Sequence, residues 1–154
     1  MPDLETAHEW GIRVIERDSA LYPAMLDLRK SILRKPLGLD LSATDLAAET
    51  EQIHFVLVNR ETENVEGCAM LIEKSGGVAK VRQVAISESI RAKGLGQFLM
   101  KGVEETARVR HFSEIQLHAR DSAVPFYLHI GYEIVGDSFI EVGLPHFLMR
   151  KKIA

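Results

Sequence analysis

The chain has 154 residues, the length of one ordinary domain, and 46% of them are hydrophobic, as in a globular protein with a single core. Its formal net charge of −3 offers no broad basic field for nucleic acid, so any anion site must be local. The N-terminus lacks the apolar core of a secretory signal and no apolar run approaches the roughly eighteen residues of a membrane span, so we expect a cytoplasmic protein without a membrane partner.

The first elements predicted along the chain are a strand and two helices. Alternating residues predict a strand over Gly11–Glu16. Asp18 or Ser19 offers an N-cap for a helix whose apolar residues continue to Ile32, and Pro23 falls in its first turn. A second, shorter helix is predicted over residues 42–51.

Three strands follow, over Ile53–Asn59, residues 65–73 and Val78–Ile86. Turn residues between them predict hairpins, so the three strands are expected to be antiparallel neighbours. The single cysteine, Cys68, lies in the apolar middle strand, where it is expected to be a buried small side chain in a reducing compartment. The unbroken apolar end of the third strand predicts a segment covered on both faces.

The second half of the chain alternates helices and strands. An amphipathic helix is predicted from Leu95 to Arg110, a strand over residues 115–119, and a short helix over residues 122–130 that Gly131 ends. Two final strands are predicted over residues 132–142 and 145–152. The order β α α β β β α β α β β predicts a mixed α/β (α+β) domain with a right-handed strand-helix-strand crossover.

A glycine-rich loop, Arg91-Ala92-Lys93-Gly94-Leu95-Gly96, stands between the third of those strands and the amphipathic helix. The first turn of a helix presents unpaired N–H groups and a partial positive charge, glycine lets an anion approach the backbone, and the two cations can neutralise it. The loop therefore predicts a phosphate site. Gln97 stands where a P-loop would need lysine, and Leu99 stands where a dinucleotide fingerprint would need its third glycine.

The loop resembles the Arg/Gln-x-x-Gly-x-Gly/Ala signature of the GNAT family of N-acetyltransferases. A second motif, from Ala123 through Phe126-Tyr127 to Gly131-Tyr132, is similar to the A-x-x-F-Y-x-x-x-G-F/Y segment of the same family. The element order matches the family from Gly11 to Lys152. The resemblance implies one N-acetyltransferase domain over residues 1–154, with a mixed, mostly antiparallel sheet of about seven strands and helices on both faces.

The resemblance also implies acetyl-CoA as the cosubstrate. The glycine loop would hold its pyrophosphate, main-chain groups at a strand bulge would bind its pantetheine arm and polarise the thioester, and no metal is implied. The expected cofactor-binding residues are Val84, Ala85, Ile86, Arg91, Ala92, Lys93, Gly94, Leu95, Gly96, Gln97 and Phe126.

Proton transfer needs further groups. The resemblance assigns Tyr127 as the general acid for the departing thiolate, and a phenol of pKa near 10 can donate to a thiolate whose acid has a pKa near 8.5. Lys80 stands where histone-type relatives carry a glutamate base, so their mechanism does not transfer. His118, Glu141 and His146 are candidates for the base or the acceptor site, and a surface role is the alternative for each.

Two functions from different classes remain open. The first is an N-acyltransferase that moves an acetyl group to a primary amine of a small molecule or a protein, by direct attack in a ternary complex. The second is a catalytically inactive acyl-CoA-binding regulatory module of the same fold. The retention of Tyr127 favours the enzyme. A nucleotide-binding or nucleic-acid-binding domain is disfavoured, so no nucleic-acid partner is expected, and a homodimer is compatible with either function.

Overall fold

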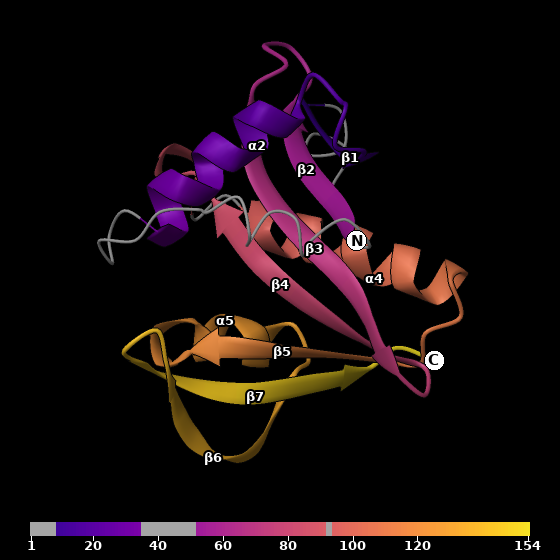
Figure 1. The fold of residues 1–154 in the computed structure, drawn as a ribbon, viewed down its shortest axis with the longest axis vertical. Coiled ribbons are helices and arrows are strands. Elements are labelled where there is room, and N and C mark those ends of the chain that lie inside the picture. The colour runs from indigo at the N-terminus through magenta and orange to yellow at the C-terminus, as the bar shows by residue number, and fades with distance from the viewer. Residues whose placement is uncertain (1–8, 35–51, 92–93) are drawn as a thin grey trace. The chain divides into compact units, whose positions relative to one another are not determined.

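The computed structural model describes residues 9–34, 52–91 and 94–154, so the helix predicted over residues 42–51 lies outside the described residues. A seven-stranded sheet in the order β1-β2-β3-β4-β5-β7-β6 organises the fold (Figure 1). Its strands are β1 (Trp10–Ile15), β2 (Ile53–Asn59), β3 (Val65–Ser75), β4 (Val78–Ile86), β5 (Glu114–Arg120), β6 (Glu133–Glu141) and β7 (Leu144–Lys152). The main helices are α2 (Tyr22–Arg29), α4 (Leu95–Val109) and α5 (Val124–His129).

The sheet is mostly antiparallel, as predicted. The pairs β1–β2, β2–β3, β5–β7 and β6–β7 are antiparallel, whereas β4 and β5 are parallel neighbours joined through α4. Parallel neighbours need a crossover connection, and α4 supplies it. The predicted bounds of β2 and β4 agree with the structure, and β3 extends two residues further than expected, to Ser75.

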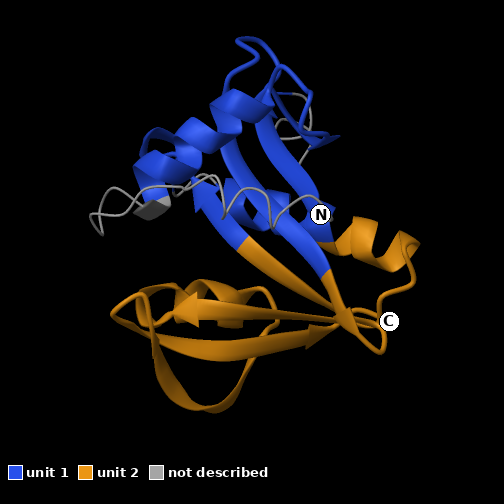
Figure 2. Cartoon of the chain, in the orientation of Figure 1, with its two compact units in different colours: residues 1–72, 83–103 blue, residues 73–82, 104–154 orange. Residues whose placement is uncertain are grey.

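The chain divides into two compact units, residues 1–72 with 83–103 and residues 73–82 with 104–154 (Figure 2). In the first unit α2 packs on one face of the strands, where Met25, Val56, Cys68 and Ala85 are buried in one apolar cluster. The start of α4 packs on the other face, where Gly102 lies so close to Ile12 of β1 that a Cβ would stand 2.6 Å from its Cδ1. The burial of Cys68, 1% exposed, confirms its predicted packing role.

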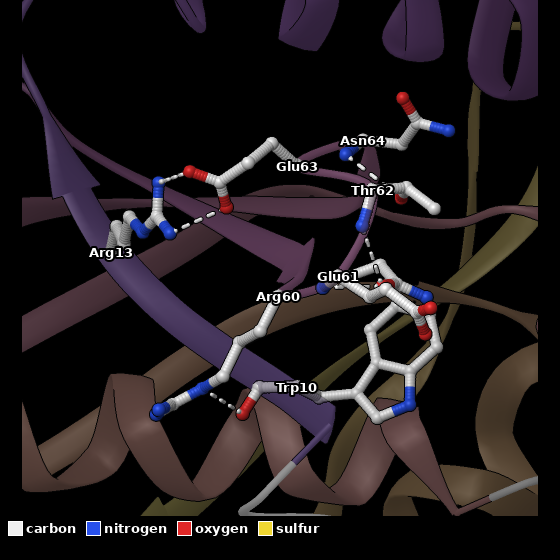
Figure 3. Close-up of polar contacts among 8 residues, drawn as sticks. Trp10, Arg13, Arg60, Glu61, Thr62, Glu63 and Asn64 are labelled. Atoms are coloured by element: carbon white, nitrogen blue, oxygen red, sulfur yellow. Dashed lines mark hydrogen bonds and ion pairs between the residues drawn. The ribbon is translucent and has the colours of Figure 1, made fainter.

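A polar turn closes the hairpin between β2 and β3 and ties it to β1 (Figure 3). The Asn59 side chain accepts two backbone N–H groups of the turn, at 2.9 and 3.1 Å. Arg13 of β1 donates to both carboxylate oxygens of Glu63, at 3.2 and 2.8 Å, and Arg60 Nε donates to the Trp10 carbonyl at 3.2 Å. The predicted hairpin turn is therefore confirmed, and side-chain bonds hold it to the neighbouring strand.

The second unit places α5 and the C-terminal part of α4 on the apolar face of β5 and β7. Alternation along β5 buries Ile115, Leu117 and Ala119 and leaves the polar residues between them partly exposed. On the buried side Tyr132 donates to Glu104 Oε2 at 2.9 Å, and Lys151 Nζ donates to Glu104 Oε1 at 3.0 Å. The buried carboxylate of Glu104 is thus satisfied by two partners, as its burial requires.

Local differences from the predicted elements arise mainly at helix ends. The N-cap of α2 is Leu21, two residues after the predicted Ser19, so the predicted cap is wrong. The Ser19 Oγ instead accepts the Leu21 N–H at 3.1 Å, just before the helix. The helical winding does continue past Arg29, but as a wider π-turn over Lys30–Arg34. The last predicted helix begins as a 3₁₀ turn over Asp121–Ala123 and becomes α-helical at Val124, because Pro125 suits a first helical turn. Gly131 ends it at φ +103°, as predicted.

No helix in residues 9–34, 52–91 and 94–154 is long and apolar enough to cross a membrane.

Candidate active site

The predicted phosphate loop ends in a left-handed glycine at the start of α4. Gly94 has φ +76°, and a Cβ built on it would meet no heavy atom within 4 Å. Its carbonyl accepts the Phe98 N–H at 3.1 Å, so the first helical bond starts at Gly94. The N–H groups that follow have no intrahelical acceptor and point out of the helix start. A bare backbone, open space and a 15-residue helix dipole together suit a bound phosphate.

Arg91 adds a cation to this end of α4. Its side chain is 51% exposed, its Nε donates to the Ile86 carbonyl at 3.2 Å, and its nearest acid is Glu88 at 4.0 Å. The Nε bond orients the guanidinium, about half of the side chain is exposed, and Nη1 is the atom that lies near Glu88. Ala92 and Lys93, which were predicted to share the phosphate, lie outside the described residues. The residues that are described fit a diphosphate.

Strand β4, which precedes the loop, runs from Val78 to Ile86 and contains a left-handed residue, Gln83. The parallel ladder joins Val78–Val81 to Glu114–Leu117, and two residues later Gln83 adopts φ +55°, a conformation that costs a non-glycine residue energy. The Cys68 thiol donates to the Gln83 carbonyl at 3.5 Å. The strand bulge that the resemblance implied stays a prediction, and the positive φ of Gln83 lies in the segment where it was expected. Sequence reasoning missed Gln83 because a glutamine gives no local sign of this conformation.

After Gln83 the strand is less covered than predicted. Ala85 is buried in the cluster under α2, but Val84 and Ile86 are only half-buried. The expectation of a segment covered on both faces is therefore wrong, because alternation turns these two side chains away from that cluster. Part of each of these two side chains is therefore accessible to solvent.

Tyr127 and Phe126 lie in α5, and their burial differs. Tyr127 is 7% exposed, with its ring edge-on to Phe126 at 5.0 Å and to Tyr132 at 5.6 Å. Its hydroxyl bonds to no other residue in the described part of the chain, and burial raises its pKa well above the ordinary tyrosine value. The hydroxyl therefore stays protonated and available as a donor, although full proton transfer to a thiolate is harder than for an ordinary phenol. Phe126 is half-buried.

Three predicted residues from three strands meet in the second unit. His118 Nδ1 of β5 lies 2.9 Å from Glu141 Oε1 of β6, and His146 Nε2 of β7 lies 3.7 Å from Glu141 Oε2. Phe139 touches both imidazoles, edge-on to His118 at 4.9 Å and stacked on His146 at 6.1 Å. We name His118, Glu141 and His146 the imidazole–carboxylate cluster. A surface role for each residue alone was the alternative, and the structure instead brings the three together.

Neighbouring charges act on the cluster. Burial works to raise the pKa of Glu141, but the hydrogen bond and charge of His118, with the charges of His146 and Lys80, bring that pKa below its ordinary value. The pKa of Lys80 on β4 is lowered by burial and then by Arg82 and Lys74, while Glu141 opposes the shift. Glu141 is therefore a carboxylate at neutral pH, held among basic groups.

A metal site is not formed by the described residues, among which no group of three or more histidine, cysteine, aspartate or glutamate side chains is arranged to hold an ion.

Comparison with known proteins places this geometry in a family. The family model described as an acetyltransferase (GNAT) domain matches residues 39–153. The chain belongs to the GNAT acetyltransferase family. The Bacillus subtilis protein YyaT is 34% identical to it over 105 residues, which is 68% of this chain and 69% of that protein.

Solved structures share the GNAT fold at low sequence identity. An aminoglycoside 6'-N-acetyltransferase complexed with coenzyme A superposes with a TM-score of 0.78 at 18% identity, covering 94% of this chain and 97% of that one. A GNAT family acetyltransferase from Elizabethkingia anophelis with acetyl-CoA bound has a TM-score of 0.72 at 14% identity, covering 94% and 98%. These likenesses confirm the predicted fold, and family membership supports acyl transfer in general terms.

Proposed function

We propose that this protein is an N-acyltransferase that moves an acetyl group from acetyl-CoA to a primary amine, with donor and acceptor bound together. The observation that carries the proposal is the left-handed Gly94, with open space above it, at the start of α4. Related GNAT structures hold coenzyme A or acetyl-CoA. The acceptor belongs to the class of small-molecule or protein amines, and the single buried cysteine suits the reducing cytoplasm.

In this proposal backbone groups bind most of the donor. The N–H groups of Leu95, Gly96 and Gln97 receive the pyrophosphate oxygens, and Arg91 neutralises part of their charge. The segment Val84–Ile86, which follows the left-handed Gln83, receives the pantetheine arm, and its main-chain N–H groups polarise the thioester carbonyl. Acetyl-CoA supplies the activated acyl group when bound.

The chemistry is attack of the amine nitrogen on the thioester carbon, which forms the C–N bond and breaks the C–S bond. The buried Tyr127 hydroxyl donates a hydrogen bond to the departing sulfur, because its raised pKa keeps it protonated. The thiolate leaves with its electron pair and takes a proton from solvent. The nitrogen must lose a proton for the amide to form.

The donor half of the proposal is tested by thermal unfolding with acetyl-CoA. A ligand at a hundred times its Kd stabilises by about 2.7 kcal/mol, which for a chain of this length raises Tm by about 5–11 °C. Gly94→Ala puts a methyl group into the space assigned to phosphate and should remove most of that shift. Gly136→Ala is the matched control, since Gly136 has φ +79° and equally open space around a built Cβ.

An alanine with positive φ destabilises the folded protein by about 1 kcal/mol at either position, so both variants should have similarly lowered Tm values without ligand. Only Gly94→Ala should then lose the acetyl-CoA response. A full response in both variants would remove the phosphate assignment.

The transfer half is tested by release of free thiol with spermidine, L-lysine, tyramine, kanamycin and a peptide with a free N-terminus. Turnover with any of these amines supports the enzyme. Binding of acetyl-CoA without turnover on the whole panel would instead favour the regulatory module.

A further inference from the structure

The imidazole–carboxylate cluster fixes the protons of its two histidines. A carboxylate and a carbonyl can only accept hydrogen bonds, so the nitrogen facing each of them carries the proton. His118 Nδ1 faces the Glu141 carboxylate at 2.9 Å, and His146 Nδ1 faces the Leu144 carbonyl at 2.9 Å. In their neutral forms both imidazoles are therefore protonated at Nδ1 and carry a lone pair at Nε2.

Exposure separates the two histidines. The His146 side chain is 5% exposed and its Nε2 points to Glu141 Oε2 at 3.7 Å, so its lone pair faces the cluster interior. The His118 side chain is 27% exposed, and no residue in 9–34, 52–91 or 94–154 forms a hydrogen bond with its Nε2. His118 therefore presents an accessible proton-accepting nitrogen, with a carboxylate behind it.

The register of the strands gives His118 its position. The parallel ladder ends at the pair Val81 and Leu117, and His118 is the next residue of β5. The proton acceptor thus stands where the ladder stops.

Acyl transfer to an amine requires such a group. A lysine-like amine with a pKa near 10.4 is neutral in roughly one molecule in two thousand at pH 7. An imidazole exchanges protons near neutral pH, and a carboxylate on its other nitrogen stabilises the imidazolium that forms. We propose that Nε2 of His118 accepts the proton of the acceptor amine, and that Glu141 is the positioning residue that holds the imidazole in the form able to do so.

This inference rests on the proposed N-acyl transfer. The amine lone pair attacks the thioester carbon, the proton on nitrogen passes to His118 Nε2, and the C–S electron pair leaves with the sulfur. The imidazolium, bonded to the Glu141 carboxylate, returns its proton to water, and the thiolate takes a proton from water. The net change is one amide and one free thiol for each amine and thioester.

Several charged groups surround this pair, and a pH experiment must allow for them. Lys80 and Arg82 come from β4 and Lys74 from β3, Arg120 follows two residues along β5 on the same face, and β7 contributes His146. A variant and the wild type that share all of these groups must therefore be compared over the same pH range.

The first test needs no acceptor. NMR of imidazole nitrogens in the wild-type protein should show neutral His118 protonated at Nδ1, and Glu141→Ala should abolish that preference. A wild-type His118 protonated at Nε2 would overturn the inference, because the lone pair would then face the carboxylate.

The second test is the pH dependence of acetylation, using whichever amine of the panel the wild type acetylates. His118→Asn keeps a donor near the position of Nδ1 and removes Nε2. It should lower kcat/KM at pH 7 by about 100-fold. The deficit should shrink toward pH 10, because the free amine then deprotonates in solution. His129→Asn makes the same change at an exposed residue at the end of α5 and should leave the whole profile unchanged.

Failure of the inference and failure of the proposed function look different. If the wild type turns over and His118→Asn follows it in parallel at every pH, His118 is not the proton acceptor. If acetyl-CoA binds but the wild type acetylates no amine of the panel, the proposed transfer fails and this inference fails with it. An unchanged acetyl-CoA shift in His118→Asn shows that the variant is folded and binds the donor.

Discussion

Tyr127 and Tyr132 allow the same chemical change to be made at two touching rings with opposite consequences. Their ring centroids are 5.6 Å apart and both are buried, at 7% and 3% exposed. Tyr132 donates to Glu104, a carboxylate that is itself 4% exposed, at 2.9 Å, whereas the Tyr127 hydroxyl bonds to no residue of the described chain. Removing each hydroxyl in turn therefore compares a donor that satisfies a buried carboxylate with a donor that bonds to no described residue.

Tyr132→Phe leaves one oxygen of a buried carboxylate without its donor, which costs about 2 kcal/mol and lowers Tm by about 4–8 °C. Burial, followed by the charge and hydrogen bond of Glu104, raises the pKa of Tyr132, so the hydroxyl stays protonated and the loss should be constant from pH 6 to 9. Tyr127→Phe removes no described bond and should move Tm by less than about 2 °C.

Activity should show the reverse pattern. Tyr127→Phe should lower kcat by about 100-fold with little change in acetyl-CoA binding, since it removes a donor needed at the departing sulfur. Tyr132→Phe, assayed below its lowered Tm, should keep kcat within about twofold. Thermal unfolding by circular dichroism and thiol release from the same preparations measure both effects. Equal loss of stability in the two variants would show that Tyr127 has a structural partner, and equal kcat in Tyr127→Phe and wild type would refute its role at the sulfur.

Three further predictions concern stability. In urea unfolding, Gly102→Ala should raise the free energy of unfolding by about 1 kcal/mol more in an Ile12→Val background than in the wild type. The Ile12→Val change removes the Cδ1 atom that lies 2.6 Å from the added Cβ, so the higher helix propensity of alanine can then stabilise α4. Additive effects of the two substitutions would contradict the contact. Since the folded-state pKa of Glu141 is lowered, Glu141→Gln should destabilise the protein at pH 6–7 and lose its effect as pH falls below 4.5, and a deficit that grows in acid would contradict the sign. The exposed pair of Arg13 and Glu63 should show a coupling below about 1 kcal/mol that weakens in 1 M salt, despite its two-bond geometry, and a salt-independent coupling would argue against screening.

The sequence predicted features that depend on neighbouring residues. The glycines expected to end a loop and a helix, Gly94 and Gly131, both have positive φ, at +76° and +103°. Runs of strand-forming residues bounded by turn residues placed β2 and β4 at their observed bounds, and the apolar stripe placed α4 within one residue. Each of these signals is local, since a turn or a strand face is determined by residues a few positions apart.

Features that depend on distant parts of the chain could not be read in the same way. Gln83 adopts its left-handed conformation two residues after the pairing of β4 with β5 ends, and a glutamine has no intrinsic preference that would predict it. His118 and Glu141 are 23 residues apart and meet because β7 lies between β5 and β6 in the sheet. Considered singly, each polar residue matched an ordinary surface position. Strand order turned three scattered residues into one cluster.

The phase of β6 shows how finely this cluster depends on register. Val135 pairs with Leu148 and Phe139 with His146, so β6 carries three residues where β7 carries one. Side chains alternate along a strand, and the two extra residues therefore return Phe139 and Glu141 to the face shared with His146 and His118. A single extra residue would have turned Glu141 to the opposite face. The donor loop depends on backbone that a short motif encodes, whereas the proposed proton acceptor depends on a bulge in another strand, so the acceptor side can change between relatives while the donor loop stays recognisable.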